Sequence, residues 1–257
     1  GDYNVTVEYD GEKAKSSIKV KTTLEGNDLT KMFQNSSQYY IKVLDTKGNP
    51  LTGKKVKSNI NGVFYERNID ENGMARMNIN LRPNEYIITA ENPANGEMHS
   101  NIVTVLSTIV ENRDITKYYR NDTQYTLRLL DAQGKPVGKG EEVVFNINGV
   151  LYKRYSNEDG YAKLNINLGP DNYIITADYK GCQVSNSVRV LTVLTGKDVT
   201  LVHNTGGKYE VKLVDGQGRP YSGQTITMNI NGIFYDRITD SNGIARLNIN
   251  LQAGEYI

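Results

Sequence analysis

One stretch of the sequence occurs three times, and this repetition limits the chain to a repeated β structure. The first copy begins with Asn59–Tyr65, continues through Asp70–Gly73 and ends at Asn78–Leu81, and later copies begin at positions 146 and 229. Each copy alternates polar and apolar residues, passes through an Asn-Gly pair, alternates again, reaches a second turn closed by glycine, and alternates once more. This pattern predicts three antiparallel strands joined by two tight turns.

The Asn-Gly pairs are expected to form type I′ turns. Both central residues of such a turn need positive φ, and Asn and Gly reach that region at the lowest cost. The turn-forming residues are Asn61, Gly62, Asn148, Gly149, Asn231 and Gly232.

The repeat also divides the chain into units of roughly 85 residues, each large enough for its own core. Residues 2–9 align with 172–179, and residues 17–20 align with 187–190, so residues 1–24 are interpreted as the last two strands of a preceding repeat. The repeats that follow are expected at 25–106, 107–194 and 195–257, and the last of these lacks its final two strands. Short linkers are expected at 107–110 and 195–197.

Within a whole unit, alternation with period two predicts seven strands and no helix. In the first unit they are expected near 29–32, 39–44, 56–61, 63–69, 74–81, 86–90 and 101–106. Short strands separated by turns every ten residues or so indicate an all-β fold of tandem antiparallel β-sandwiches.

Composition excludes several classes of partner. The 30 Lys and Arg residues almost cancel the 29 Asp and Glu residues, so the chain lacks the basic footprint of a nucleic-acid binder. No apolar run approaches the length of a membrane span, so no membrane contact is expected within this segment.

No group of residues predicts catalysis, a metal site or a cofactor. His99 and His203 occupy unrelated positions in different repeats, and the single cysteine, Cys182, has no histidine nearby in the sequence. Acidic turns such as Asp240–Gly243 could attract calcium, but each offers only one or two carboxylates, which favours a structural turn. We therefore expect a protein that is not an enzyme.

Asparagines form the most regular polar feature. Alternation places them opposite the apolar residues, on one outer face that could bind glycan or pair with another subunit. The simpler interpretation is a soluble, uncharged surface. The candidates for this face are Asn59, Asn78, Asn80, Asn146, Asn165, Asn167, Asn229, Asn248 and Asn250.

Three sites fit the N-glycosylation acceptor pattern, at Asn4, Asn35 and Asn121. Asn35 and Asn121 occupy equivalent positions in two repeats, so chance explains them less easily than a single site. If the chain is exported, these asparagines could carry sugar.

The order of turn motifs makes the resemblance to a known family specific. Each repeat has Asp-x-x-Gly-x-Pro after one strand, a strand ending in Ile-Asn-Gly, then Asp/Asn-x-x-Gly-x-Ala; Tyr-x-Ile-Thr-Ala follows in the first two. This order resembles the tandem immunoglobulin-like repeats of prokaryotic surface proteins, most nearly those of archaeal, methanogen adhesin-like proteins. The resemblance implies immunoglobulin-like sandwiches in an extracellular, cell-surface adhesion protein.

We therefore expect a structural and adhesion protein that forms a rod or filament of repeats. Its partners would be neighbouring repeats of a longer chain, or copies of itself joined head to tail by donation of residues 1–24 into the incomplete third repeat. The donor residues would be Tyr3, Val5, Val7, Ile18 and Val20. The alternative is a lectin-like module that binds cell-surface glycan on the asparagine face, although the chain has no Trp to support it.

Overall fold

The computed structural model describes residues 1–257 and contains strands and turns but no helix. The residues form two compact units, one of residues 1–108 with 131–135 and the other of residues 109–130 with 136–257.

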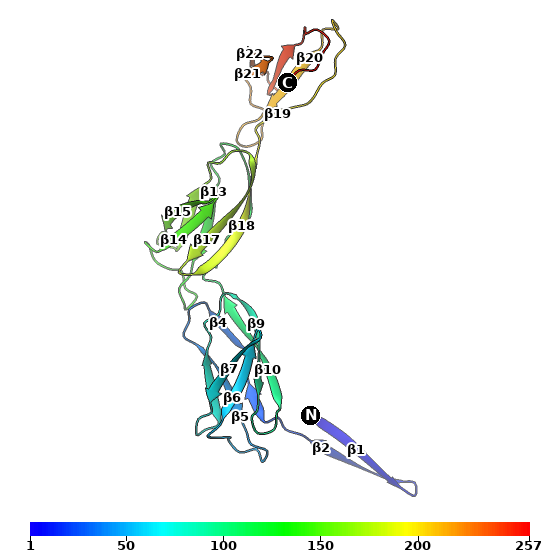
Figure 1. Cartoon of the computed structure of the whole chain (residues 1–257), viewed down its shortest axis with the longest axis vertical. Coiled ribbons are helices and arrows are strands. Elements are labelled where there is room, and N and C mark those ends of the chain that lie inside the picture. The colour runs from blue at the N-terminus through cyan, green and yellow to red at the C-terminus, as the bar shows by residue number, and fades with distance from the viewer. The chain divides into compact units, whose positions relative to one another are not determined.

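The first unit contains a hairpin and a complete β-sandwich, which we call the first repeat. The hairpin strands β1 (Asp2–Tyr9) and β2 (Glu12–Lys19) pair only with each other (Figure 1). One sheet of the sandwich has the order β4-β10-β9-β6-β7 and the other has the order β3-β5-β8. Their bounds are β3 (Leu24–Gly26), β4 (Leu29–Met32), β5 (Gln38–Val43), β6 (Lys55–Ile60), β7 (Val63–Asn68), β8 (Met74–Asn78), β9 (Asn84–Glu91) and β10 (Met98–Leu106).

The second unit contains a complete sandwich, the second repeat, and an incomplete one, the third repeat. The second repeat has sheets β12-β18-β17-β14-β15 and β11-β13-β16. Its strands are β11 (Ile109–Val110), β12 (Ile115–Tyr118), β13 (Gln124–Leu129), β14 (Glu142–Ile147), β15 (Val150–Tyr155), β16 (Tyr161–Asn165), β17 (Asp171–Tyr179) and β18 (Cys182–Leu191). The third repeat has sheets β19-β20-β23 and β21-β22, with strands β19 (Leu194–Gly196), β20 (Lys208–Leu213), β21 (Thr225–Ile230), β22 (Ile233–Ile238) and β23 (Ile244–Asn248).

The first strand of each complete repeat is split between the two sheets, which the sequence did not predict. In the first repeat, β3 pairs with β5 in one sheet, and β4 then pairs with β10 in the other. Each complete repeat therefore has eight strands rather than seven. The β4–β10 and β12–β18 pairs are parallel, so the sheets are not purely antiparallel. The expected linkers are in part strands, since Ile109 belongs to β11 and is buried, and Thr195 lies in β19.

The turns explain why the same residues recur. In the first Asn-Gly turn, φ is 50° at Asn61 and 80° at Gly62, and the pairs at 148–149 and 231–232 also have positive φ at both residues. The second turn needs glycine for a further reason. A Cβ at Gly73 would lie 2.8 Å from the Val43 carbonyl oxygen, so no larger residue fits without movement of the backbone.

Each complete repeat has its own apolar core. In the second repeat, Tyr125 and Phe145 are fully buried and meet edge to face, with ring centroids 5.8 Å apart. The core of the third repeat is smaller, and only Val211, Met228, Ala245 and Leu247 are buried in it. Within residues 195–257, no strands correspond to β17 and β18, which complete the core of the second repeat.

A buried lysine joins the two sheets in each complete repeat. Lys31 on β4 is only 5% exposed, and its Nζ donates hydrogen bonds to the carbonyls of Ile79 (2.8 Å) and Ser37 (3.2 Å). Lys117 makes the equivalent two bonds at 2.8 and 3.3 Å. Burial lowers the pKa of both ammonium groups. The third repeat has Leu201 at this position.

Candidate functional site

A polar network that runs from a buried tyrosine to an exposed aspartate marks the place where the two closing strands join each complete repeat. In the first repeat, the Tyr39 hydroxyl on β5 donates to Asn101 Oδ1 on β10 at 2.7 Å. Asn101 Nδ2 donates to Asp28 Oδ1 at 3.3 Å, and the backbone N–H of Ile102 donates to the same oxygen at 2.8 Å. The network therefore ties β10 both to the opposite sheet and to the segment between β3 and β4.

The electrostatics of the first network follow from these bonds. The N–H of Ile102 and the amide of Asn101 hold the pKa of the Asp28 carboxyl below its ordinary value. Burial, with a smaller contribution from the Asp28 charge, raises the pKa of Tyr39 to about 12. The hydroxyl therefore stays protonated and remains a donor at any ordinary pH.

The second repeat builds the same network with one more donor. Tyr125 donates to Asn186 Oδ1 at 2.6 Å, and Asn186 Nδ2 and the Ser187 N–H donate to Asp114 Oδ1 at 3.0 and 2.9 Å. Asn112 Nδ2 also donates to Asn186 Oδ1, at 2.7 Å. The first repeat has Gly26 in the corresponding place, two residues before the aspartate, where a Cβ would collide with Asn101 Oδ1.

In the third repeat, half of this network is present and has no partner. Tyr209 and Asp198 occupy the positions of Tyr125 and Asp114, but no hydrogen bond reaches the Asp198 carboxylate or the Tyr209 hydroxyl. Residues 199–202, which correspond to β12, do not form a strand because no neighbouring strand pairs with them. Val199 and Val202 are 49% and 75% exposed.

The hairpin β1–β2 has the same structure as the closing strands β17–β18 of the second repeat. It matches β17–β18 with a constant difference of 170 residues: Asp2 pairs with Lys19 as Asn172 pairs with Arg189, and the same register continues to the turn. The turn residues also agree, with φ of 48° at Asp10 and 51° at Lys180.

The two hairpins differ in what covers their apolar faces. In β17–β18, Ile175, Ala177 and Val188 are fully buried. The corresponding donor candidates Val5, Val7 and Ile18 are 37%, 59% and 51% exposed, and Tyr3 and Val20 are also more than half exposed. The hairpin thus presents an apolar face of the kind that closes a sandwich in the second repeat.

The asparagines predicted to share one outer face lie on two different sheets. Alternation identifies the outward side of each strand correctly, but Asn59 lies on β6 of one sheet whereas Asn78 lies on β8 of the other. Asn146 and Asn165 are divided between two sheets in the same way.

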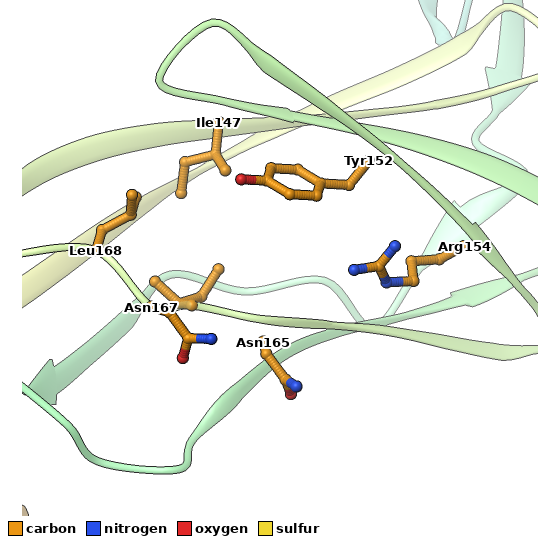
Figure 2. A pocket seen from close by; sticks show the side chains of 7 residues that line it. Ile147, Tyr152, Arg154, Asn165, Asn167 and Leu168 are labelled. Carbon is orange, nitrogen blue, oxygen red and sulfur yellow. The ribbon is translucent and has the colours of Figure 1, made fainter.

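Part of the asparagine set instead lines a shallow pocket in the second repeat (Figure 2). Its lining includes Tyr152 and Arg154 on β15, and Asn165 and Asn167 at and beyond the end of β16. The Arg154 guanidinium lies 5.6 Å from the centre of the Tyr152 ring. The same Tyr–Arg pair occurs on β7 and β22, at distances of 5.7 Å.

Two of the three glycosylation candidates use their amides within the structure. Asn35 Nδ2 donates to the Ala132 carbonyl at 2.7 Å, and Asn121 Nδ2 donates to the Gly216 carbonyl at 2.6 Å, each within its own unit. Asn4 on β1 is exposed. A glycan on Asn35 or Asn121 would be attached to the nitrogen that makes these bonds.

The carboxylates of the acidic turns accept hydrogen bonds from backbone N–H groups of the same turns. Asp240 Oδ1 accepts bonds from the N–H groups of Asn242 (2.8 Å) and Ile244 (3.0 Å), and Asp70 does the same in the first repeat. No group of three or more His, Cys, Asp or Glu side chains in the structure could hold a metal ion. The structure has no apolar helix of the length that a membrane span requires.

Comparisons with known proteins find matches among solved structures only. No family model matches the chain, and no curated protein matches it. Among solved structures, the I9–I11 tandem of titin is 14% identical with a TM-score of 0.34, and the match covers 98% of this chain and 91% of the titin chain. A Ca²⁺-stabilised adhesin that helps an Antarctic bacterium to bind ice is 16% identical with a TM-score of 0.22, over 96% of this chain and 73% of the adhesin.

A structure from a 1.5-MDa bacterial ice-binding adhesin is also 16% identical, with a TM-score of 0.22 and coverage of 88% and 86%. The sheet topology of the chain itself shows tandem immunoglobulin-like β-sandwiches. At these scores, the likeness carries no argument about function.

Proposed function

We propose that the chain belongs to an extracellular, cell-surface protein of the archaeal adhesin-like kind, in which immunoglobulin-like repeats follow one another as a structural rod or filament. In this proposal, residues 1–24 close a preceding sandwich, and the repeats at 25–106 and 107–194 are complete. The third sandwich, at 195–257, is completed by a hairpin of the β1–β2 type.

The observation that carries the proposal is the match between the exposed hairpin and the buried one. Val5 and Ile18 are at least 37% exposed, whereas their counterparts Ile175 and Val188 are fully buried. Burying such side chains contributes about 1.5–3 kcal/mol for each large one. Covering such a sandwich edge with such a hairpin, from a neighbouring repeat or from another copy, would therefore be strongly favourable.

If the closing hairpin comes from another copy and not from a neighbouring repeat of a longer chain, the contact joins unlike surfaces, is heterologous and gives an open fibre. Sedimentation velocity over a range of concentrations tests this. Val5→Lys, on the apolar face, is expected to abolish association, and Thr6→Lys, on the other face of β1, is the matched control. A chain that stays monomeric at every concentration would refute strand donation.

Hydrogen exchange provides a second measurement of the same event. Residues 199–202 form no strand in the open repeat. They are expected to become protected when the hairpin docks, because their counterparts in β12 pair with β18. Localisation is tested separately, by labelling intact cells with an antibody against the chain.

A second candidate function, glycan binding, is supported by the pocket in the second repeat. Tyr152, Arg154, Asn165 and Asn167 supply an aromatic ring, a cation and two amides at one place. Arg154 forms no ion pair, although its Nη1 donates to the Lys153 carbonyl at 2.7 Å. An acidic glycan would fit this chemistry. A glycan array with wild type and Arg154→Ala tests it, and loss of acidic-glycan binding in the variant is the expected result.

A further inference from the structure

We propose that the pocket of the second repeat is a subsite for the carboxylate of an acidic polysaccharide, and that every repeat carries the same subsite, the third with the highest affinity. This inference rests on the glycan binding proposed above. It adds the class of glycan, the number of subsites and their order of affinity.

The pocket of the second repeat offers mainly hydrogen-bond donors to a ligand. Gln124 Nε2 donates to Asn165 Oδ1, so the acceptor end of that amide is occupied and its Nδ2 is left for a ligand. The Asn167 amide and the Tyr152 hydroxyl make no hydrogen bond within the chain. No acidic residue lines the pocket. This lining suits a ligand group that accepts hydrogen bonds.

Arg154 supplies a positive charge and keeps one edge of its guanidinium unused. Its Nη1 donates to the Lys153 carbonyl at 2.7 Å, and its Nε and Nη2 make no hydrogen bond within the chain. A guanidinium binds a carboxylate through two such N–H groups in parallel. The half-buried side chain extends from β15 into the space between Tyr152 and the two asparagines (Figure 2). This edge of the guanidinium is therefore the place for an anionic group of the ligand.

The size of the cavity limits how much of a glycan can enter. Its volume is about 180 Å³, whereas pockets that enclose a whole drug-sized ligand measure roughly 300–1,000 Å³. One charged sugar residue therefore fits this cavity better than a whole oligosaccharide does. The neighbouring sugars of the same polymer would remain in solvent.

The same side chains recur in the other two repeats, in the same register. In each repeat, the tyrosine and the arginine lie two residues apart on the strand that follows the Asn-Gly turn. Each arginine donates from Nη1 to the carbonyl of the preceding residue, at 2.7 or 2.8 Å, and has no carboxylate partner. A subsite that occurs once in each repeat suits a ligand whose charged group also recurs, such as a polymer of uronic acid. The corresponding residues are Tyr65, Arg67, Asn78 and Asn80 in the first repeat, and Tyr235, Arg237, Asn248 and Asn250 in the third.

The third repeat differs at one position beside this subsite. In the first two repeats a glutamine lies opposite the first asparagine, as Gln124 lies opposite Asn165. The residue opposite Asn248 is Lys208, which forms no ion pair. It adds a second positive charge where the other repeats have a neutral amide. The third subsite is therefore expected to bind a carboxylate most tightly.

Nuclear magnetic resonance of the whole chain can measure each subsite separately. The side-chain Nε–Hε signals of the three arginines are assigned from the variants Arg67→Gln, Arg154→Gln and Arg237→Gln. Titration with trigalacturonate is expected to shift all three signals and to give the tightest dissociation constant at Arg237. The methyl ester of trigalacturonate keeps the sugar backbone but removes the charge, so it is expected to bind at least about tenfold more weakly. Sulfated maltotriose tests whether a sulfate replaces the carboxylate.

Three further variants test the role of each group. Lys208→Gln is expected to weaken binding at the third subsite to the level of the other two. Arg154→Lys keeps the charge but loses the two parallel N–H groups, so it should weaken binding at the second subsite by about tenfold. Lys153→Gln removes a charge from the exposed side of the same strand and is the matched control, with no expected change. Melting temperatures near that of the wild type confirm that the variants are folded.

The outcomes separate this inference from the proposed function. If the wild-type chain binds neither trigalacturonate nor any glycan on the array, glycan binding itself is wrong, and the arginines serve only to keep edge strands such as β15 from pairing with other chains. If only the Arg154 signal shifts, glycan binding stands and the recurrence is wrong. Equal binding of the methyl ester, or tighter binding of the sulfated sugar, overturns the carboxylate assignment. Unchanged binding in Lys208→Gln overturns the order of affinity.

Discussion

The two complete polar networks predict different costs for the same substitution. Tyr39→Phe removes the one hydroxyl that donates to Asn101 Oδ1, and Asn101 is only 8% exposed. The loss is one hydrogen bond together with an unsatisfied buried oxygen, about 1–3 kcal/mol of unfolding free energy. Tyr125→Phe removes the equivalent hydroxyl, but Asn112 Nδ2 still donates to the acceptor at 2.7 Å. Its cost should be near that of one neutral hydrogen bond, about 0.5–1.5 kcal/mol.

Because several repeats contribute to any global signal, the assay must resolve them. Hydrogen exchange with mass spectrometry, over a series of urea concentrations, gives the unfolding free energy from peptides of β9–β10 for the first repeat and β17–β18 for the second. The double variant Tyr125→Phe with Asn112→Gly should raise the cost to that seen for Tyr39→Phe. Equal costs for the two single variants, or a larger cost at Tyr125, would refute the argument that Asn112 supplies the spare donor.

Further predictions concern the turns, pH and metal ions. Gly243→Ala should lower the melting temperature of the third repeat more than Gly232→Ala does, because both glycines have positive φ but a Cβ at 243 would also collide with the Leu213 carbonyl. The Gly232→Ala substitution should cost about 1 kcal/mol of unfolding free energy. Equal melting temperatures for the two variants would contradict the steric argument. Tyr39 and Tyr125 have pKa values of about 12 against an ordinary 10.0, so their contribution to stability is complete below pH 10 and is lost as pH rises towards 12. An ultraviolet titration should show these two tyrosines ionising last. EDTA should leave the melting temperature unchanged, since the turn carboxylates already accept backbone N–H groups, and a fall of several degrees would reveal a bound cation.

Much of the fold is readable from the sequence because its signals are local. Alternation with period two identifies the inward face of each strand, and Asn-Gly pairs identify hairpin turns through a backbone requirement that few other residues meet. The split of the first strand is not readable in this way. Alternation predicts the strand at Leu29–Met32, but Leu24–Gly26 is too short to carry a pattern, and the sheet that each segment joins depends on partners elsewhere in the chain.

The candidate sites were harder to predict for a related reason. Alternation shows that Asn59 and Asn78 point outwards, but only the topology shows that they lie on different sheets. The burial of Lys31 and Lys117 is not predictable from the sequence, because a charged residue is normally expected at the surface. The Tyr–Asn–Asp network joins residues about 70 positions apart, such as Asp28 and Asn101. The one sequence signal for this network is that Asp28 and Tyr39 recur, at the same spacing, as Asp114 and Tyr125.

The parallel pairing of β4 with β10 determines how a complete repeat responds to tension. β4 lies near the start of the repeat and β10 at its end, and their paired residues run from Leu29–Val103 to Met32–Leu106. Pulling on the two ends of the repeat drags these strands past each other along one axis. Their hydrogen bonds are then sheared together instead of opening one after another. Within residues 195–257, positions 199–202 have no parallel partner strand, so this resistance to shear belongs to the first two repeats.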